Sequence, residues 1–385
     1  MFRFVSLFFF IFFLNTTAAA DDLNPADTCR QHHCIAVVDA GSTGSRLHIY
    51  AFDRDENSNP VNINEVWSKK VKPGFATLAP SPEAINPYLT NLFSDAPSQN
   101  MPLFFYATAG MRLLSTTKQA QYYRTLESWF AQQGQWQLVS AKTITGRNEG
   151  LYAWLAVNYQ TGALTDASKP LSGVLDMGGA SVQVALPISN DAGIEPNDLL
   201  EFDIYDRHIK LFSHSFLGLG QVVLTYQFLT SPECFANGYE LPSGLPGEGD
   251  ARTCESSVAK LINDVHGVDK IIKPVIANNQ VYSWYALGGL PAMASEQSFH
   301  FKNNQLTGQK LLEEGDNQFC HQQWEDIQSH YQGHEYVYGY CLFPAYYYAL
   351  MVDGYGLSSS NEVNYFPALK EADWTLGVVL HQPQT

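Results

Sequence analysis

Residues 171–186 of this chain read LSGVLDMGGASVQVAL. An apolar run ends at Asp176, small residues follow, and apolar residues then return at every second position. This pattern predicts a strand, a tight turn and a second strand. The adjacent glycines of the turn bring no side chain between backbone and ligand, so several N–H groups can point at one phosphate.

A close copy of this pattern lies earlier in the chain, at residues 34–50, which read CIAVVDAGSTGSRLHIY. In this copy Asp39 takes the place of Asp176. Residues 281–289 likewise correspond to residues 104–110, because each segment is apolar and ends in small residues. Gene duplication would explain the repeat, and chance similarity between two strand–glycine turns is the alternative. We expect two related lobes that hold one phosphate chain between them.

Residues 1–20 have the pattern of a secretory signal, with one basic residue (Arg3), a Phe-rich apolar block and the small residues 18–20. A retained anchor helix is the alternative, but the apolar block is short for a membrane span. No later stretch reaches that length. We therefore expect a secreted or periplasmic, monomeric product without a membrane anchor.

The rest of the chain is long enough for two domains. We assign residues 29–155 and 359–385 to lobe I and residues 156–358 to lobe II. The Gly/Pro-rich residues 237–249 predict a surface loop. Residues 374–380 predict a short strand that returns to lobe I.

Six cysteines, an even number in a chain expected to be exported, predict three disulfides, although six allow 15 pairings. The simplest pairing is sequential: Cys29 with Cys34, Cys234 with Cys254, and Cys320 with Cys341. A metal site formed by Cys29, His32, His33 and Cys34 is the alternative. This segment lacks the usual spacing of two Cys/His ligand pairs.

The formal net charge is −16, and the chain lacks the excess of basic residues that binding to nucleic acid requires. We therefore expect no DNA or RNA partner. A small phosphate substrate is compatible with this charge, because backbone N–H groups and a divalent cation can bind phosphate. The sequence contains no Gly-x-Ser-x-Gly elbow, zinc-protease helix motif or Walker loop. These serine-hydrolase, metalloprotease and P-loop classes are therefore disfavoured.

Glu149 lies between Gly146 and Gly150, where a predicted strand (residues 138–144) meets a predicted helix (residues 151–159). Hydrolysis of a phosphoanhydride by water needs a group that orients the water and receives its proton. Glu149 is our candidate for this general base. An exposed glutamate that only stabilises the start of a helix is the alternative.

Asp39 and Asp176 are candidates for holding a divalent metal, directly or through its waters. Alternatively, each aspartate stabilises its own turn. Ser181 and Gln183 alternate with apolar valines, so both point to the same polar face of their strand. On that face they could fix the attacking water.

The two turns also supply N–H groups and hydroxyls for phosphate binding. The turn residues predicted to bind phosphate are Ser42, Thr43, Gly44, Ser45, Gly178, Gly179 and Ala180. Thr108 and Arg112, at the end of the strand that starts near Phe104, would add a hydroxyl and a cation. A structural ion pair is the equal alternative for Arg112.

Five segments in this order resemble the apyrase family, the nucleoside triphosphate diphosphohydrolases. They are residues 38–50, 107–114, 146–150, 175–183 and 286–289. The resemblance implies an α/β, two-lobed, actin-like (ribonuclease H-like) ATPase fold with the active site in the inter-lobe cleft. It also implies hydrolysis of nucleoside tri- and diphosphates with Mg²⁺ or Ca²⁺.

By the same resemblance, Glu149 corresponds to the general base and Ser181 and Gln183 to the residues that hold the water. Asp39 and Asp176 correspond to carboxylates that bind Mg²⁺ or Ca²⁺ through water.

The family holds the nucleotide base on aromatic residues of the second lobe, which suggests Tyr346 or Tyr347 here. This chain differs from many animal members of the family in two features. Gly44 stands where they carry a histidine, so contacts that separate tri- from diphosphates can differ. They also have membrane anchors at both ends, whereas the signal expected here resembles that of the secreted bacterial branch.

Two alternative functions stay open at this point. One is an exopolyphosphatase or guanosine-polyphosphate phosphatase of the same superfold, although such relatives are typically cytosolic. The other is a catalytically silent nucleotide-binding module.

Overall fold

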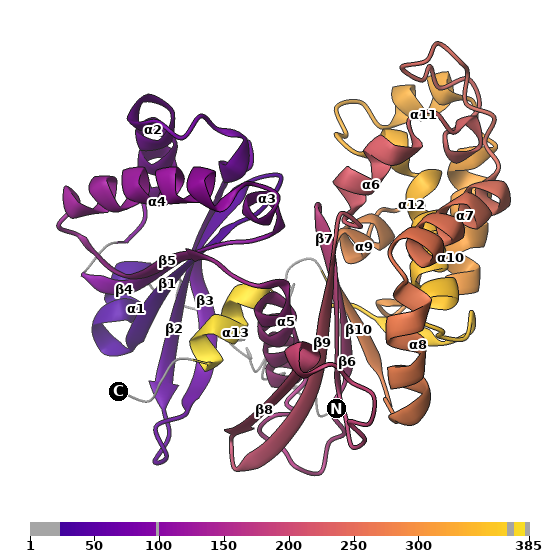
Figure 1. Cartoon of the computed structure of the whole chain (residues 1–385). Helices are drawn as coiled ribbons and strands as arrows, with labels where there is room; N and C mark the ends of the chain where they lie inside the picture. Colours follow the sequence, from indigo (N-terminus) through magenta and orange to yellow (C-terminus); the bar gives the residue numbers. More distant parts are fainter. Residues whose placement is uncertain (1–23, 98–99, 368–372, 382–385) are drawn as a thin grey trace, which may run out of the picture.

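The computed structural model describes residues 24–97, 100–367 and 373–381. The chain forms two lobes, each built on one β-sheet, with helices α5 (Gly146–Gln160) and α13 (Trp374–Leu380) between them (Figure 1). The predicted signal at residues 1–20 lies outside the described residues. Among the residues that are described, no helix is long and apolar enough to cross a membrane.

The first lobe contains a five-stranded sheet in the order β3-β2-β1-β4-β5. Its strands are β1 (His33–Ala40), β2 (Ser45–Arg54), β3 (Pro60–Val71), β4 (Met101–Ala107) and β5 (Trp136–Thr143). The helices of this part are α1 (Pro25–Gln31), α2 (Pro82–Phe93), α3 (Ala109–Arg112) and α4 (Thr116–Ala131). Buried side chains of α2 and α4, such as Leu89 and Leu126, form one core with Leu47 and Phe105 of the sheet.

The second lobe contains a seven-stranded sheet in the order β11-β12-β10-β6-β7-β9-β8. Its strands are β6 (Gly173–Met177), β7 (Ser181–Pro187), β8 (Leu199–Ile204), β9 (Arg207–Leu217), β10 (Trp284–Gly288), β11 (Gln305–Thr307) and β12 (Glu362–Asn364). The remaining helices are α6 (Gln221–Phe228), α7 (Ala251–Lys260), α8 (Val268–Asn278), α9 (Gly289–Ala294), α10 (Gly308–Gly315), α11 (Trp324–His330) and α12 (Leu342–Tyr348). These helices gather on the side of the sheet that faces away from the first lobe (Figure 1).

The two sheets repeat one arrangement. In the first, β1 pairs antiparallel with β2 and parallel with β4. In the second, β6 pairs antiparallel with β7 and parallel with β10. The two predicted hairpins and the two later strands therefore occupy equivalent places, and the predicted correspondence between the halves is confirmed.

Helices α5 and α13 form a shared core between the sheets. Residues 149–158 of α5 are buried on every side of the helix, as expected for a helix enclosed by protein. This helix packs on β7, β9 and α13, and α13 also contacts β1 and β2. The chain between the lobes is thus a packed helix rather than a linker.

Three details differ from the sequence prediction. Residues 374–380 form helix α13 rather than a strand, because a short apolar run fits either structure and Asp373 caps this one by accepting a hydrogen bond from Thr375 N at 2.9 Å. The predicted lobe boundary at residues 155–156 falls inside α5. Strand β12, which we assigned to lobe I, pairs with β10 of the second sheet.

The disulfides join Cys29 to Cys34, Cys234 to Cys254 and Cys320 to Cys341, as the sequential pairing predicts. The alternative metal site at Cys29 and Cys34 is therefore wrong, because both sulfur atoms are in a disulfide.

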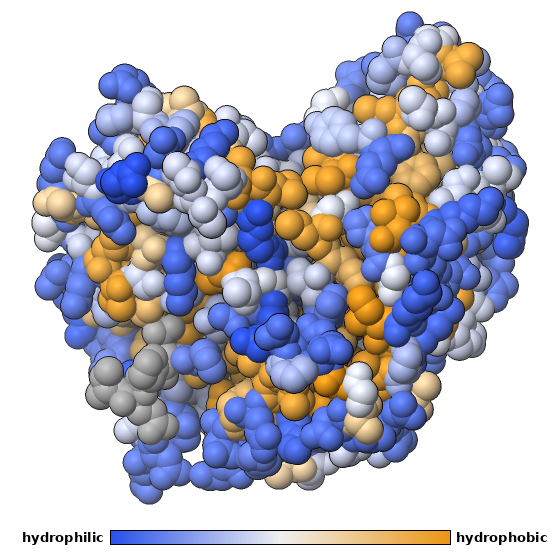
Figure 2. Space-filling view, viewed as in Figure 1, coloured by the Kyte–Doolittle hydropathy of each residue, from blue (hydrophilic) through white to orange (hydrophobic). Residues whose placement is uncertain are grey.

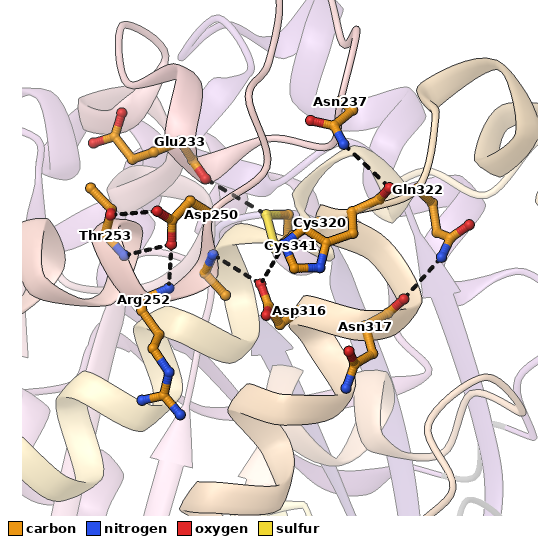
Figure 3. A network of polar contacts seen from close by, with 12 residues as sticks. Glu233, Asn237, Asp250, Arg252, Thr253, Asp316, Asn317, Cys320, Gln322 and Cys341 are labelled. Carbon is orange, nitrogen blue, oxygen red and sulfur yellow. Dashed lines mark hydrogen bonds and ion pairs between the residues drawn. A yellow bond between two sulfur atoms is a disulfide. The ribbon is translucent and has the colours of Figure 1, made fainter.

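Figure 3 shows the Cys320–Cys341 disulfide inside a polar network at the start of α7. Asp250 accepts hydrogen bonds from the backbone N–H groups of Arg252 (3.1 Å) and Thr253 (3.0 Å), and Asp316 accepts one from Ala251 N at 3.2 Å. These carboxylates satisfy the first N–H groups of the helix.

The contact between α13 and α5 gives a test of the shared core. A β-carbon added to Gly377 would lie 2.0 Å from the carbonyl oxygen of Tyr152, so Gly377→Ala must push the helices apart. We expect this variant to lower the free energy of unfolding by about 1–3 kcal/mol in a urea titration. Gly134→Ala is the control, because no heavy atom lies within 4 Å of its added carbon. An equal loss in both variants would contradict the packing described.

Candidate active site

A cavity of about 400 Å³ lies where the two hairpins turn. Figure 2 shows that the surface is hollowed between the two lobes. The cavity wall contains residues 41–46 of the first turn and residues 176–181 of the second. Glu149 at the start of α5 and Asp373 before α13 complete the wall between the turns. The equivalent ends of the two sheets therefore meet at one site.

The two turns approach each other closely across the cavity. A β-carbon added to Gly179 would lie 2.5 Å from Ser42 Oγ and 3.2 Å from Thr43 Cγ2. A side chain at this position would force the side chains of Ser42 and Thr43 to move. The second turn is also fixed from behind, because Val222 N of α6 donates to the carbonyl oxygen of Gly179 at 2.9 Å. Backbone N–H groups and hydroxyls are thus held around a space suited to an anion.

A cluster of polar side chains surrounds Glu149. Arg112 Nη2 lies 2.5 Å from Glu149 Oε2 and donates to Ser181 Oγ at 2.8 Å. Gln183 Nε2 lies 2.7 Å from Ser181 Oγ, 2.9 Å from Ser215 Oγ and 3.2 Å from Glu149 Oε2. The carboxylate is held by side chains from both lobes, Arg112 of α3 and Gln183 of β7, and it is not a solitary helix-start residue.

Glycines bring the start of α5 against β9. A β-carbon on Gly146 would lie 2.2 Å from Ser215 Oγ, and one on Gly150 would lie 2.4 Å from Ser213 Oγ. This close packing leaves Glu149 only 7% exposed. The alternative of an exposed glutamate at a helix start is therefore wrong, since the side chain is enclosed.

Burial controls the charge of the carboxylates in the cavity. Burial raises the pKa of Glu149, the Arg112 guanidinium beside it lowers that pKa, and Asp373 raises it again. Burial also raises the pKa of Asp39 well above its ordinary value, and the nearby negative charges of Asp373 and Glu149 add to this effect. The site concentrates negative charge out of water, where a cation would be bound favourably.

Asp39 and Asp176 fit a hydrated divalent cation. Asp39 Oδ1 is buried and makes no hydrogen bond within the described part of the chain. Nowhere in that part do three or more His, Cys, Asp or Glu residues form a group that could hold a metal. Two carboxylates and hard oxygen donors suit a cation that keeps several waters, as Mg²⁺ does. The metal roles of both residues stay predictions.

The sequence profile of the GDA1/CD39 (nucleoside phosphatase) family matches residues 26–231 and 235–385. The chain belongs to this family. It is 27% identical to the mouse (Mus musculus) protein named ectonucleoside triphosphate diphosphohydrolase 1, over 421 residues that cover 90% of this chain and 80% of the mouse protein.

Two solved structures resemble this GDA1/CD39 chain in fold. A structure described as nucleoside triphosphate hydrolases from Neospora caninum has a TM-score of 0.60 at 13% identity, covering 91% of this chain and 92% of that one. The Aquifex aeolicus PPX-GPPA enzyme has a TM-score of 0.53 at 15% identity, covering 91% and 99%. The two-lobed, actin-like α/β fold that the sequence predicts is confirmed.

Most predicted site residues of this GDA1/CD39 chain line the cavity. They are Asp39, Ser42, Thr43, Gly44, Ser45, Thr108, Glu149, Asp176, Gly178, Gly179, Ala180 and Ser181. Gln183 and Arg112 lie behind this wall and contact Glu149 and Ser181. Arg112 forms an ion pair with Glu149, as the alternative interpretation of this residue stated. The contact of Arg112 with phosphate stays a prediction.

Tyr346 and Tyr347 do not line the cavity, which corrects the base-stacking prediction. Both side chains are 0% exposed, so neither ring offers a free face to a base. Tyr346 Oη donates to the carbonyl oxygen of Leu219, and Tyr347 Oη donates to Gln221 Oε1, each at 2.5 Å. An apolar segment dense in tyrosine is typical of core as well as of a binding surface, and this segment is core.

Several cavity residues escaped the sequence analysis. Tyr336 and Tyr340 line the cavity and lie ten and six positions before Tyr346. Arg46 lies in the first hairpin (residues 34–50), and the sequence pattern indicated no role for it. Asp373 and Trp374 come from the far end of the chain, and only the path of the chain brings them here. The apolar run after Trp374 indicated a return to the first lobe, but it carried no signal for a cavity.

The buried charge of Asp39 predicts a link between cation, pH and stability. Because the folded-state pKa of Asp39 is raised, its contribution to stability is largest at acid pH and is lost as the pH rises through that pKa. In EDTA, Asp39→Asn should therefore gain stability relative to the parent as the pH rises. Mg²⁺ or Ca²⁺ at about 100 times Kd should stabilise the parent by about 2.7 kcal/mol and stabilise the variant less. Thermal melts at several pH values measure both effects, and equal cation responses would refute the role of Asp39.

Proposed function

We propose that the chain hydrolyses nucleoside tri- and diphosphates with a divalent cation, by in-line attack of a water that Glu149 activates. The observation that carries this proposal is the cluster of Glu149, Ser181 and Gln183 at the cavity between two glycine turns. The name of the mouse relative, ectonucleoside triphosphate diphosphohydrolase 1, supports the same substrate class.

The polar cluster provides the contacts that a nucleophilic water needs. Ser181 Oγ lies within hydrogen-bond distance of Arg112 Nη2 and Gln183 Nε2, so the serine proton is left to donate to a water. Glu149 is the acceptor for the proton that the water loses, and its raised pKa improves it as a base near neutral pH. Gln183 Nε2 lies 2.7 Å from Ser181 Oγ and 3.2 Å from Glu149 Oε2, so Gln183 would orient the two groups that hold the water.

The two turns would hold the phosphate chain while the water attacks. The first turn offers the hydroxyls of Ser42 and Thr43, and the second offers the backbone of Gly178 and Gly179. A bound Mg²⁺ or Ca²⁺ would neutralise phosphate charge. Asp39 and Asp176 are the residues we propose to hold it. No residue of the cluster is a nucleophile in this scheme, so no covalent intermediate forms.

Tyr336 is our revised candidate for the base contact. It lines the cavity on the second-lobe side and is partly exposed, in contrast to Tyr346 and Tyr347. A flat ring can stack on any base, which suits a tolerant enzyme. We further propose a monomeric, secreted or periplasmic protein, as the ectoenzyme relative and the signal pattern of residues 1–20 suggest.

Replacement of the general base tests the reaction. Glu149→Gln keeps the size of the side chain but cannot accept the proton, so kcat for ATP with Mg²⁺ or Ca²⁺ should fall about 10²–10⁴-fold. Glu83→Gln is a matched control, because Glu83 is also in the first turn of a helix but is exposed. Release of phosphate from ATP, ADP and polyphosphate measures activity, with EDTA as a blank. Parental activity in Glu149→Gln would overturn the assignment.

The same assay separates the alternatives. Cleavage of polyphosphate but not of ATP would favour the exopolyphosphatase alternative, to which the Aquifex aeolicus PPX-GPPA structure is similar in fold. Binding of ATP without release of phosphate would identify a silent nucleotide-binding module.

Removal of the Tyr336 ring tests the base contact. Loss of stacking is worth about 1–3 kcal/mol, so Tyr336→Ala should raise KM for ATP about 5- to 150-fold. Inorganic triphosphate has no base, and its KM should change little. Tyr336→Phe keeps the flat face and serves as the control. A parallel rise of KM for both substrates in Tyr336→Ala would contradict the stacking role.

A further inference from the structure

The proposed mechanism does not use His48, a buried histidine near the cavity. The side chain lies in β2, is 1% exposed and does not line the cavity itself. Its Nδ1 lies 2.9 Å from Glu65 Oε2, and its Nε2 lies 3.5 Å from Asp373 Oδ2. The ring therefore connects a partly exposed carboxylate of β3 to a carboxylate on the cavity wall.

Each carboxylate oxygen of Asp373 has a contact within the protein, Oδ1 by hydrogen bonds and Oδ2 at ion-pair distance. Its Oδ1 accepts hydrogen bonds from Thr375 N at 2.9 Å and from Thr375 Oγ1 at 2.7 Å, while its Oδ2 faces His48. Thr375 Oγ1 also lies 2.7 Å from Tyr50 Oη, and the Tyr50 ring stacks on His48 with 5.8 Å between ring centres. The Thr375 hydrogen bonds fix the carboxylate at the start of α13, and the Tyr50–Thr375 contact and the ion-pair distance to His48 place it beside β2.

Asp373 and Asp39 line the same cavity, Asp373 from the residue before α13 and Asp39 from the end of β1. The cavity therefore receives a carboxylate from the far end of the sequence as well as those of the two hairpins.

We propose that Asp373 contributes to the binding of the cavity's divalent cation through the cation's waters, together with Asp39, and that His48 is the positioning residue that holds Asp373 there. This inference rests on the cation of the proposed function. It adds a carboxylate from the far end of the sequence to the two that the hairpins supply. His48 contacts neither cation nor substrate in this scheme and acts only through Asp373.

A purely structural role for His48 is the rival explanation. In that case the ring would only attach the start of α13 to the first sheet. Its loss would then reduce stability without changing the affinity for a cation. Cation affinity, rather than stability or activity alone, is therefore the decisive quantity.

The test measures the half-saturating concentrations of MgCl₂ and CaCl₂ from thermal melts of the full chain. Asp373→Asn keeps a side chain that caps helices well but removes the charge. Replacement of a residue that orients a metal site typically costs 10–100-fold in affinity, so Asp373→Asn and His48→Leu should each raise the half-saturating concentration about 10-fold. The double variant should show little more than Asp373→Asn, because both act at one position.

His214→Leu is the matched control. His214 also pairs with a carboxylate, Asp198, at 2.8 Å and packs between aromatic rings, but it lies in β9 and does not line the cavity. It should lose stability and keep the parental half-saturating concentration. His48→Gln, which keeps a polar group toward Glu65, is the second variant if His48→Leu yields little folded protein.

If the folded His48 variant has the same half-saturating cation concentration as the parent, the positioning role is overturned. If Asp373→Asn has the same value as the parent, the cation contact is overturned. A parent that shows no cation response would overturn this inference together with the metal assignment. A parent that responds to cation but releases no phosphate from nucleotides would refute the proposed function alone, and the melts would still decide the role of His48.

Discussion

Negative charge held out of water at the meeting point of two sheets is the constraint on which this structure depends. Asp39, Glu149, Asp176 and Asp373 all line one cavity, and burial raises the pKa of the first two. Such a concentration of carboxylates is unfavourable unless positive charge accompanies it. Arg112 supplies positive charge beside Glu149, and Arg46 supplies it near Asp39 and Asp373. A divalent cation would add further positive charge at this site.

The second requirement is close approach of backbone to backbone, and glycine meets it. Gly179 lets one turn come against Ser42 of the other, while Gly146 and Gly150 let α5 press on β9 and enclose Glu149. Larger residues at these positions would separate the elements that carry the phosphate turns and the base. The same packing explains why α5 is both the bridge between the lobes and the support of the candidate base.

Much of the site was predictable because its residues are local in the sequence. Asp39, Ser42, Asp176 and Ser181 lie in two hairpins whose alternation and glycines are visible in the printed chain. The repeated hairpins also predicted two equivalent sheets, and the strand pairings confirm them. The error at Tyr346 had a physical cause, since a run of tyrosines indicates burial of aromatic surface but does not distinguish core from cavity.

The sequence by itself determined the elements whose information is short-range, namely the two strand–turn–strand units and the glycine-flanked glutamate. Tertiary structure alone decided which distant residues meet. Asp373 reaches the cavity because α13 packs on α5 and β2, and the same packing places Asp373 Oδ2 3.5 Å from His48 Nε2 of β2. Contacts of this kind depend on the path of the chain in space. No periodicity or spacing along the sequence records that path.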